Sequence, residues 1–176
     1  MEKEKSYSQV GQDVWILSLF PKGYKGFFMD LGCNDPKNIN NTLLLEENGW
    51  EGVAVDINDL SELWKERKTR FIQMDALDAK DIMEPALIDY VSIDVDAIGT
   101  NYQTIKNLLA ASFQFKAITI EHNYYISEEF NQRERIPQRR LLLSFGYVLA
   151  KEDVMDDDGQ FNKFEDFWIN PTYITL

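Results

Sequence analysis

The chain has 176 residues, of which 44% are hydrophobic and 27% are charged, as in a single soluble domain of ordinary size. Its formal charge of -12, from 18 Lys and Arg against 30 Asp and Glu, disfavours binding to a phosphate backbone, so we expect no nucleic acid partner. Cys33 is the single cysteine, which excludes a disulfide framework and a thiolate zinc site and indicates a reducing compartment.

Targeting and membrane signals are not evident in the sequence. The chain opens with charged and polar residues, unlike a signal peptide, and no run approaches the roughly twenty apolar residues of a membrane-spanning helix. We therefore expect a cytoplasmic protein with no membrane partner. Because neither an internal repeat nor a linker interrupts the chain, the sequence predicts one domain over residues 1–176.

The first predicted elements are a helix and a strand. Apolar residues 14–20 are too continuous for an exposed helix and predict a short helix packed against the sheet edge or over the site. Residues 26–31 form an apolar run that ends in an acid and turn formers, as a buried parallel strand does. Ligands of open α/β sheets lie beyond the carboxyl ends of such strands, which places Asp30, Gly32 and Asn34 at a binding site.

A second unit repeats this pattern. Residues 40–42 offer N-cap side chains for a helix over 43–48, and residues 52–56 form another apolar run that ends in an acid, Asp56. In nucleotide-binding units, an acid at the end of the second strand commonly binds the two ribose hydroxyls. The alternative is that Asp56 only forms a turn.

The fourth predicted strand covers residues 86–96. Its end carries Asp94 and Asp96 on one side of the pleat, because the two acids are two residues apart. Before it we predict a helix over 60–68, a strand over 71–74 that ends in Asp75, and a helical turn over 79–83.

The remaining elements complete an alternation of strands and helices, which is the signature of a doubly wound parallel sheet. No helical pattern separates the last two strand-like segments, so this pair is predicted to be antiparallel. The acidic residues 156–159 lack the spacing of a calcium loop and are interpreted as a hairpin turn. The expected elements are a helix over 104–111, a strand over 115–121, a long polar connection over 124–136, a helix over 137–143, and strands over 147–150 and 164–169.

Several motifs, taken in order, resemble the FkbM-like family of S-adenosylmethionine-dependent methyltransferases. The resemblance covers nearly the whole chain, and its specificity comes from the order of the motifs rather than from any one of them. The motifs are YSQVGQD at 7–13, DLGCNDP at 30–36, NT at 41–42, GWEGVAVD at 49–56, DA at 75–76, SIDVD at 92–96 and FEDFW at 164–168.

The resemblance implies a Rossmann-like class I methyltransferase: an α/β fold with a mostly parallel seven-stranded sheet and a C-terminal antiparallel hairpin. It also implies S-adenosyl-L-methionine as cofactor and transfer of its methyl group to an oxygen, often a sugar hydroxyl of a small acceptor. The residues it places at the cofactor are Asp30, Gly32, Cys33, Asn34, Asp56, Ile57, Asp75, Ala76 and Asp94.

The chain departs from the broader methyltransferase pattern in two places. Asn34 and Pro36 stand where glycines are common in the first loop, and residues 97–100 replace the commoner acid-glycine ending after the fourth strand. With no inserted cap domain, the acceptor pocket is expected to come from residues near 7–13, 97–103 and 122–136.

Three residues are candidates for the reaction itself: His122, Asp94 and Asp96. His122 stands just past the fifth strand, where it would act as a general base; the alternative is a histidine hydrogen-bonded at a strand end. Asp94 and Asp96, with Glu121 or Asn123, would offer oxygen ligands to Mg²⁺, although Asp94 would equally hydrogen-bond the acceptor or the cofactor's ammonium group.

Four arginines form the one cationic cluster of this acidic chain. They suit recognition of a phosphate or carboxylate on the acceptor, but the alternative, pairing with neighbouring glutamates on the surface, is favoured. The arginines are Arg133, Arg135, Arg139 and Arg140, and the glutamates are Glu128, Glu129 and Glu134.

Two rival functions and one assembly state stay open. A nicotinamide-dependent oxidoreductase would need three glycines in the first loop, where only Gly32 is present. A non-catalytic Rossmann-like binding or assembly module would keep the fold without the reaction. The closing hairpin, or the edge near residues 7–20, is a candidate homodimer surface.

Overall fold

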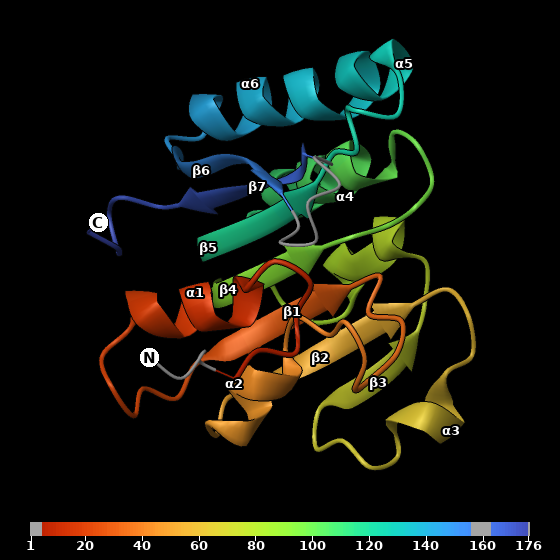
Figure 1. Cartoon of the computed structure of the whole chain (residues 1–176), viewed down its shortest axis with the longest axis vertical. Coiled ribbons are helices and arrows are strands. Elements are labelled where there is room, and N and C mark those ends of the chain that lie inside the picture. The colour runs from red at the N-terminus through yellow and green to blue at the C-terminus, as the bar shows by residue number, and fades with distance from the viewer. Residues whose placement is uncertain (1–4, 156–162, 176) are drawn as a thin grey trace.

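The computed structural model of the chain describes residues 5–155 and 163–175. Seven strands form one sheet in the order β3-β2-β1-β4-β5-β7-β6, seen nearly side by side in Figure 1. The strands are β1 (Phe27–Leu31), β2 (Glu51–Asp56), β3 (Arg70–Gln73), β4 (Leu87–Ile93), β5 (Gln114–Glu121), β6 (Val148–Met155) and β7 (Lys163–Ile169).

Helices cover both faces of this sheet (Figure 1). No helix in the described part of the chain has the length and apolar character needed to cross a membrane. The helices are α1 (Gln12–Leu19), α2 (Leu43–Glu47), α3 (Ser61–Trp64), the 3-10 helix η1 (Ala76–Asp81), α4 (Thr100–Ala110), α5 (Glu128–Phe130), the π-helical segment η2 (Asn131–Arg135) and α6 (Ile136–Ser144).

The strand pairing confirms a mostly parallel sheet with an antiparallel pair at its end. β1 pairs with β2 and β4, β2 with β3, and β4 with β5, all in parallel. β7 runs antiparallel to β6, as predicted, and also to β5, so the antiparallel pairing extends beyond the closing hairpin. The predicted turn at 156–159 lies outside the described residues.

Two hydrophobic clusters hold the helices against the two faces. On one face Ile105 and Leu108 of α4 pack with Leu142 of α6 against the central strands. On the other face Trp15 and Ile16 of α1 pack against the sheet. Successive side chains of each strand point to opposite faces of the sheet. Both faces are therefore buried, which explains the continuous apolar runs in the sequence.

The predicted helix over 60–68 is wrong in length, because α3 ends at Trp64. The next residues turn inward: the side chain of Arg67 is buried, and the backbone amides of Lys68 and Thr69 donate to the carboxylate of Glu46 at 3.1 and 2.8 Å. These amides bond a side chain of α2 instead of a helical carbonyl, and the helix stops.

The fourth strand is also shorter than predicted. β4 ends at Ile93. Beyond it, the side chain of Asn101 replaces the neighbouring strand as hydrogen-bond partner of Val95: it accepts from the Val95 N–H at 2.8 Å and donates to the Val95 carbonyl at 3.1 Å. Asp94 and Asp96 therefore lie in the loop that follows β4, and the prediction that they share one side of a strand pleat is wrong.

The predicted polar connection over 124–136 is wrong as well. It contains α5 and η2, which run directly into α6. Ser127 starts this helix, since its hydroxyl accepts from the backbone amide of Phe130 at 3.4 Å. Smaller shifts affect three other helices: α1 begins at Gln12, η1 begins at Ala76, and α4 begins at Thr100.

Candidate functional site

A cavity of about 840 Å³ lies at the carboxyl ends of the central strands, where open α/β sheets bind their ligands. This volume falls in the range of roughly 300–1,000 Å³ that is typical of small-molecule sites. Nine residues predicted for the cofactor and one further reaction candidate line it together. They are Asp30, Gly32, Cys33, Asn34, Asp56, Ile57, Asp75, Ala76, Asp94 and Asp96.

A second cavity, of about 370 Å³, lies elsewhere, between the end of α4 and the end of α6. Leu109, Phe113 and Phe145 contribute to its walls. It contains none of the residues predicted for binding or reaction, and it lies beside the start of β5, away from the carboxyl ends of the parallel strands. The larger cavity is therefore the candidate site.

Gly32 sets the backbone geometry at the first loop. It has φ +83°, and a Cβ atom added there would lie 1.9 Å from the backbone oxygen of Asp94. Its own N–H donates to the carbonyl of Val55 at 2.9 Å. The loop is thus held between the ends of β2 and β4, and a residue with a side chain does not fit.

Asp56 faces the cavity and also organises its own turn. Its Oδ1 accepts from the backbone N–H and the side-chain amide of Asn58, at 2.9 and 3.0 Å, while its Oδ2 accepts from the N–H of Asn34 at 3.2 Å. The turn-forming role considered from the sequence is therefore present, and the same carboxylate lines the cavity.

Asp30 is a buried acid at the cavity floor. Burial raises its pKa to about 6, although the hydrogen bond from the Thr42 hydroxyl, at 2.8 Å, and the charge of Arg67 act in the opposite direction. Cys33 is also buried, and burial raises the pKa of its thiol, so it is inert as a nucleophile.

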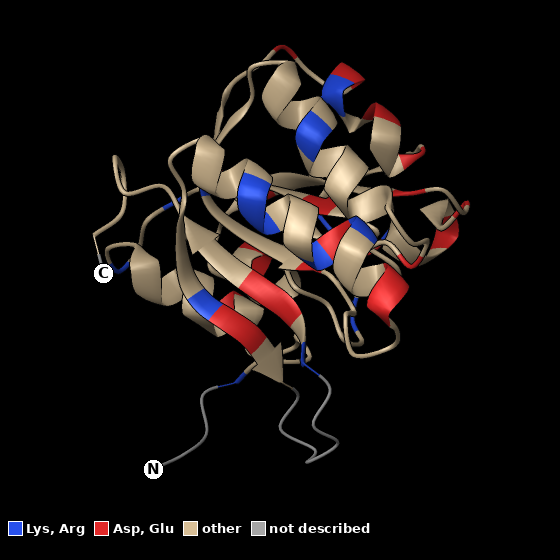
Figure 2. Ribbon diagram, turned by 90° about the horizontal axis from the view of Figure 1, so that it is seen from above, with Lys and Arg blue, Asp and Glu red and all other residues tan. Residues whose placement is uncertain are grey.

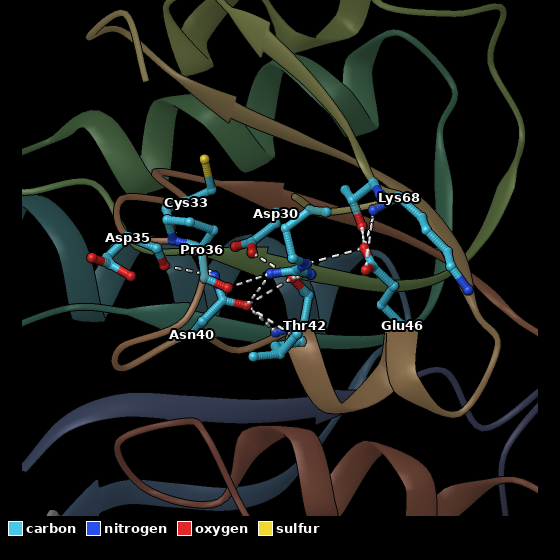
Figure 3. Close-up of polar contacts among 11 residues, drawn as sticks. Asp30, Cys33, Asp35, Pro36, Asn40, Thr42, Glu46 and Lys68 are labelled. Carbon is cyan, nitrogen blue, oxygen red and sulfur yellow. Dashed lines mark hydrogen bonds and ion pairs between the residues drawn. The ribbon is translucent and has the colours of Figure 1, made fainter. Parts of the chain in front are cut away.

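Arg67 lies outside the cavity but holds the segment 33–42, several residues of which line it, and sequence reasoning missed this role. It donates to Glu46 at 3.0 Å, to the carbonyl of Pro36 at 2.6 Å and to the side chain of Asn40 at 3.2 Å. Asn40 accepts from the Leu43 amide as well, at 2.8 Å, which starts α2. Figure 3 shows Pro36, Asn40, Thr42 and Glu46 arranged around this network. An arginine beside an apolar helical pattern gave no signal for this role.

Asp94 and Glu121 form an acid pair at the cavity edge. Burial raises the pKa of both carboxyl groups, and the pair adds to the effect at Glu121 because each would carry the same charge. Asp96 also lines the cavity. Glu121 entered the sequence interpretation only as a metal ligand; its place at a strand end was the available signal.

His122 does not join the residues that line the cavity, although the sequence places it beside Glu121. Its side chain is fully buried, with Nε2 3.5 Å from Asp153 and 3.4 Å from Asp166, and its ring lies against Tyr124. Side chains alternate at a strand end, so consecutive residues point to opposite faces. The alternative of a histidine held at a strand end fits this position better than a general base does.

Three of the four arginines in the cluster are paired, and Arg140 is exposed. Arg139 donates to both oxygens of Asp166, at 2.6 and 2.7 Å, and Arg135 donates to both oxygens of Asp153, at 2.8 and 2.7 Å. Arg133 pairs with Glu129 at 3.0 Å. Figure 2 shows basic and acidic segments interleaved along these helices and the neighbouring strands. None of the four arginines is among the residues lining the cavity.

The described residues do not support the Mg²⁺ site that the sequence suggested. Among them, the group of three or more candidate ligands that converge within 4.8 Å is His122, Asp153 and Asp166, not Asp94, Asp96 and Glu121. Arg135 and Arg139 already neutralise that convergent group, which disfavours a further cation there.

The acceptor side of the cavity comes from fewer segments than expected. Gln9 from the N-terminal segment lines it, as do Ala97 and Thr100 from the loop after β4. Residues 122–136 contribute no lining residue, and most of them lie in α5 and η2, which continue directly into α6.

The fold is that of S-adenosylmethionine-dependent methyltransferases. No family model matches the chain, and no curated protein matches it. A solved structure from Listeria monocytogenes, assigned to these methyltransferases, superposes with a TM-score of 0.62 at 12% identity, over 91% of this chain and 98% of its own.

Two further solved structures have the same fold. Aeropyrum pernix fibrillarin, which contains natively bound S-adenosyl-L-methionine, matches with a TM-score of 0.59 at 14% identity, over 92% of this chain and 74% of its own. A methyltransferase from Archaeoglobus fulgidus matches with a TM-score of 0.50 at 18% identity, over 80% and 73%. At these identities the likeness establishes the fold and leaves the activity to be argued from the cavity.

Proposed function

We propose that the protein is an S-adenosylmethionine-dependent O-methyltransferase that acts on a hydroxyl of a small, carbohydrate-like acceptor. The observation that carries this proposal is the cavity at the strand ends, which gathers the residues that the family resemblance assigns to the cofactor. The fold shared with the solved methyltransferases supports the same assignment.

The described residues fit the cofactor on three grounds. Gly32 lets the first loop and the loop after β4 meet closely at the cavity, since a Cβ atom there would clash with the backbone oxygen of Asp94. The carboxylate of Asp56, fixed by two loops, suits the two ribose hydroxyls. Asp75 and Ala76 lie where the adenine would bind, with the Asp75 carboxylate held by the amide of Leu77 at 2.9 Å.

The reaction depends mainly on position. The bound cofactor supplies a methyl group activated by its sulfonium charge. The protein holds an acceptor oxygen in line with that group, and Asp94 and Asp96 lie where they would hydrogen-bond the acceptor. The amide of Gln9 and the hydroxyl of Thr100 add neutral hydrogen-bonding groups that suit a polyhydroxyl acceptor.

The acceptor is not an anion in this proposal. The Asp, Glu, Lys and Arg residues lining the cavity are all acidic: Asp30, Asp35, Asp56, Asp75, Asp94, Asp96 and Glu121. A phosphorylated sugar would be repelled by them, and Arg133, Arg135 and Arg139 are paired with acids elsewhere.

Calorimetric titration tests the proposal. S-adenosylmethionine and its demethylated product are titrated into the parent and into Asp56→Ala. We expect micromolar binding to the parent, weakened by about tenfold or more in the variant, which loses charge-assisted hydrogen bonds of about 1.5–3 kcal/mol. Parent protein that binds neither compound would refute the assignment. Binding would justify a screen of neutral sugars as methyl acceptors.

One observation favours a second candidate, a non-catalytic module with the same fold. Residues 97–100 form the turn Ala97-Ile98-Gly99-Thr100, which leaves this side of the cavity without the usual acid, and His122 lies outside the cavity. A protein that binds the cofactor but methylates nothing across a broad hydroxyl panel would favour this function.

A further inference from the structure

Asp94 and Glu121 are brought together by the register of two neighbouring parallel strands. Ile93 of β4 pairs with Ile120 of β5, so the residues that follow lie side by side at the cavity edge. Their carboxyl groups lie close enough for each to shift the pKa of the other. Because an ionised carboxylate only accepts hydrogen bonds, a hydrogen bond between the two groups needs one proton held between them.

The surroundings of the pair contain acids but no basic partner among the described side chains that act on it. Asp96 adds negative charge from the loop after β4, and Glu165 does so from β7. Glu165 is itself buried and held by the Gln12 amide at 2.7 Å. Asp30 faces Asp94 from β1. Each of these groups disfavours a second negative charge on the pair.

The helices packed nearby do not neutralise the pair either. From α6, Gln138 donates to the backbone oxygen of Glu121 at 2.9 Å, and to Glu134 at 2.8 Å, leaving the Glu121 carboxyl untouched. Oε2 of Glu121 is buried and has no hydrogen-bond partner. Arg133 of η2 lies against Gly99 and pairs with Glu129. The pair therefore has an unused acceptor atom at a cavity that lacks cations.

We propose that Asp94 and Glu121 hold one shared proton in the free protein and release it when a sulfonium cation binds in the cavity. This inference rests on the proposed function and adds Glu121 to the residues that serve it. The bound cation supplies the positive charge that lets both carboxyl groups ionise, and the ionised pair then lies ready to accept a proton.

The proposal balances over one turnover. One proton leaves to solvent when the cofactor binds. In the transfer, the acceptor oxygen bonds the methyl carbon as the carbon–sulfur bond breaks, the bonding electrons pass to sulfur, and the acceptor's proton passes to the pair. The pair again holds one proton, and the neutral thioether no longer stabilises a second negative charge. The net release of one proton matches conversion of a sulfonium and an alcohol to a thioether and an ether.

Proton release can be counted without knowing the acceptor. S-adenosylmethionine and its demethylated product are titrated at pH 7 in buffers of different ionisation enthalpy, and the slope of the observed enthalpy gives the protons released. We expect up to about one proton for the sulfonium compound and close to none for the thioether. Equal release for the two compounds would overturn the proposal even if both bind.

Variants assign the proton to this pair. Glu121→Gln should bind S-adenosylmethionine with its proton release abolished, since the amide holds no exchangeable acid proton. Glu165→Gln is the matched control: it removes a neighbouring buried acid outside the cavity lining, and it should keep the release. Retained release in Glu121→Gln would refute the assignment. Absence of any binding to the parent would instead refute the proposed function, so the two failures are distinct.

Discussion

The backbone amide of Asn34 donates to the Asp56 carboxylate at 3.2 Å, so the loop after β1 and the acid that ends β2 form one unit at the cavity. The loop keeps this arrangement although Asn34 stands where a glycine is common in methyltransferases. Asn34 adopts φ +43°, a left-handed conformation that asparagine tolerates better than most residues. The loop has few glycines, and the Asp56 side chain from β2 holds its backbone in place instead.

Asp56→Asn separates the two roles of this carboxylate. The amide oxygen of the variant can keep the turn with Asn58, but its NH₂ group cannot accept from the Asn34 amide. We expect an affinity for S-adenosylmethionine about tenfold lower, measured by calorimetry, with a melting temperature close to that of the parent. A variant with parental affinity would contradict the role of the charged carboxylate.

Gly32→Ala should destroy the cavity edge. The added methyl group would clash with the Asp94 carbonyl at a positive φ, so we expect a destabilisation of about 1–3 kcal/mol or more and loss of cofactor binding. Gly23→Ala is the control: it has φ +82° and nothing within 4 Å of the added atom. Urea unfolding and calorimetry of the two variants separate the clash from the backbone effect. Equal behaviour of the pair would contradict this account.

Arg67→Met should loosen the wall made by residues 33–42. The variant leaves Glu46 and the Pro36 carbonyl without their buried donor, which predicts a destabilisation of about 3–5 kcal/mol in chemical unfolding. Cofactor affinity should fall as well, because this wall lines the cavity. Lys68→Met is the control, since its side chain is exposed and points away from the network in Figure 3, so it should change stability little. Unchanged stability in Arg67→Met would be incompatible with the network.

Asp30→Asn should stabilise the protein at neutral pH. Burial raises the folded-state pKa to about 6 from 3.8, so the protonated form is favoured in the folded protein and stability falls as pH rises through this window. Above pH 6 the neutral variant should therefore have a free energy of unfolding about 3 kcal/mol higher than that of the parent. Below pH 4 the difference between the two proteins should be small. Urea unfolding at pH 4, 5 and 7 measures the difference. A constant difference across pH would contradict the shift.

Arg139→Met should weaken the attachment of α6 to the last two strands. The change leaves the buried Asp166 carboxylate without its paired guanidinium, which predicts a loss of about 3–5 kcal/mol. Arg140→Met, at an exposed position on the same helix, is the matched control. Similar unfolding midpoints in the two variants would exclude this role for Arg139.

The stability of the parent at low pH depends on the carboxylate of Asp166. Burial raises the Asp166 pKa, but the contacts with His122 and Arg139 outweigh it and lower the pKa from 3.8 to about 2. This depressed pKa contributes about 2 kcal/mol of stability above pH 3.8, which is lost as pH falls toward 2. Asp166→Asn should remove this pH dependence, as seen by unfolding between pH 2 and 5.

The strands and the acids that follow them were predictable because their signals are local. A buried parallel strand needs a short apolar run, and its end needs turn formers, so Asp30, Gly32, Asp56 and Asp75 could be located from the sequence. The antiparallel closing pair followed from the missing helix between two strand-like runs.

Helix lengths and side-chain directions were not predictable, because distant side chains decide them. Glu46, which is half-buried, stops α3 by accepting from two backbone amides, and Asn101 ends β4 by holding the backbone of Val95. His122 and Glu121 are adjacent in the sequence, but the strand directs one into a buried ion-pair cluster and the other to the cavity. A shift of one residue moves a side chain to the other face of the sheet, and local sequence does not determine which face a residue takes.

The sequence by itself determined the order of strands and helices and the acidic character of the strand ends, since both depend on neighbouring residues. Only the tertiary structure decided which of these acids share a cavity, and which acids elsewhere are paired with arginines. Asp94 and Glu121 are 27 residues apart and meet because β4 and β5 pair in register. Arg139 is occupied because the hairpin brings Asp153 and Asp166 to α6. Such contacts join segments far apart in the chain, and they exist only once the sheet has formed.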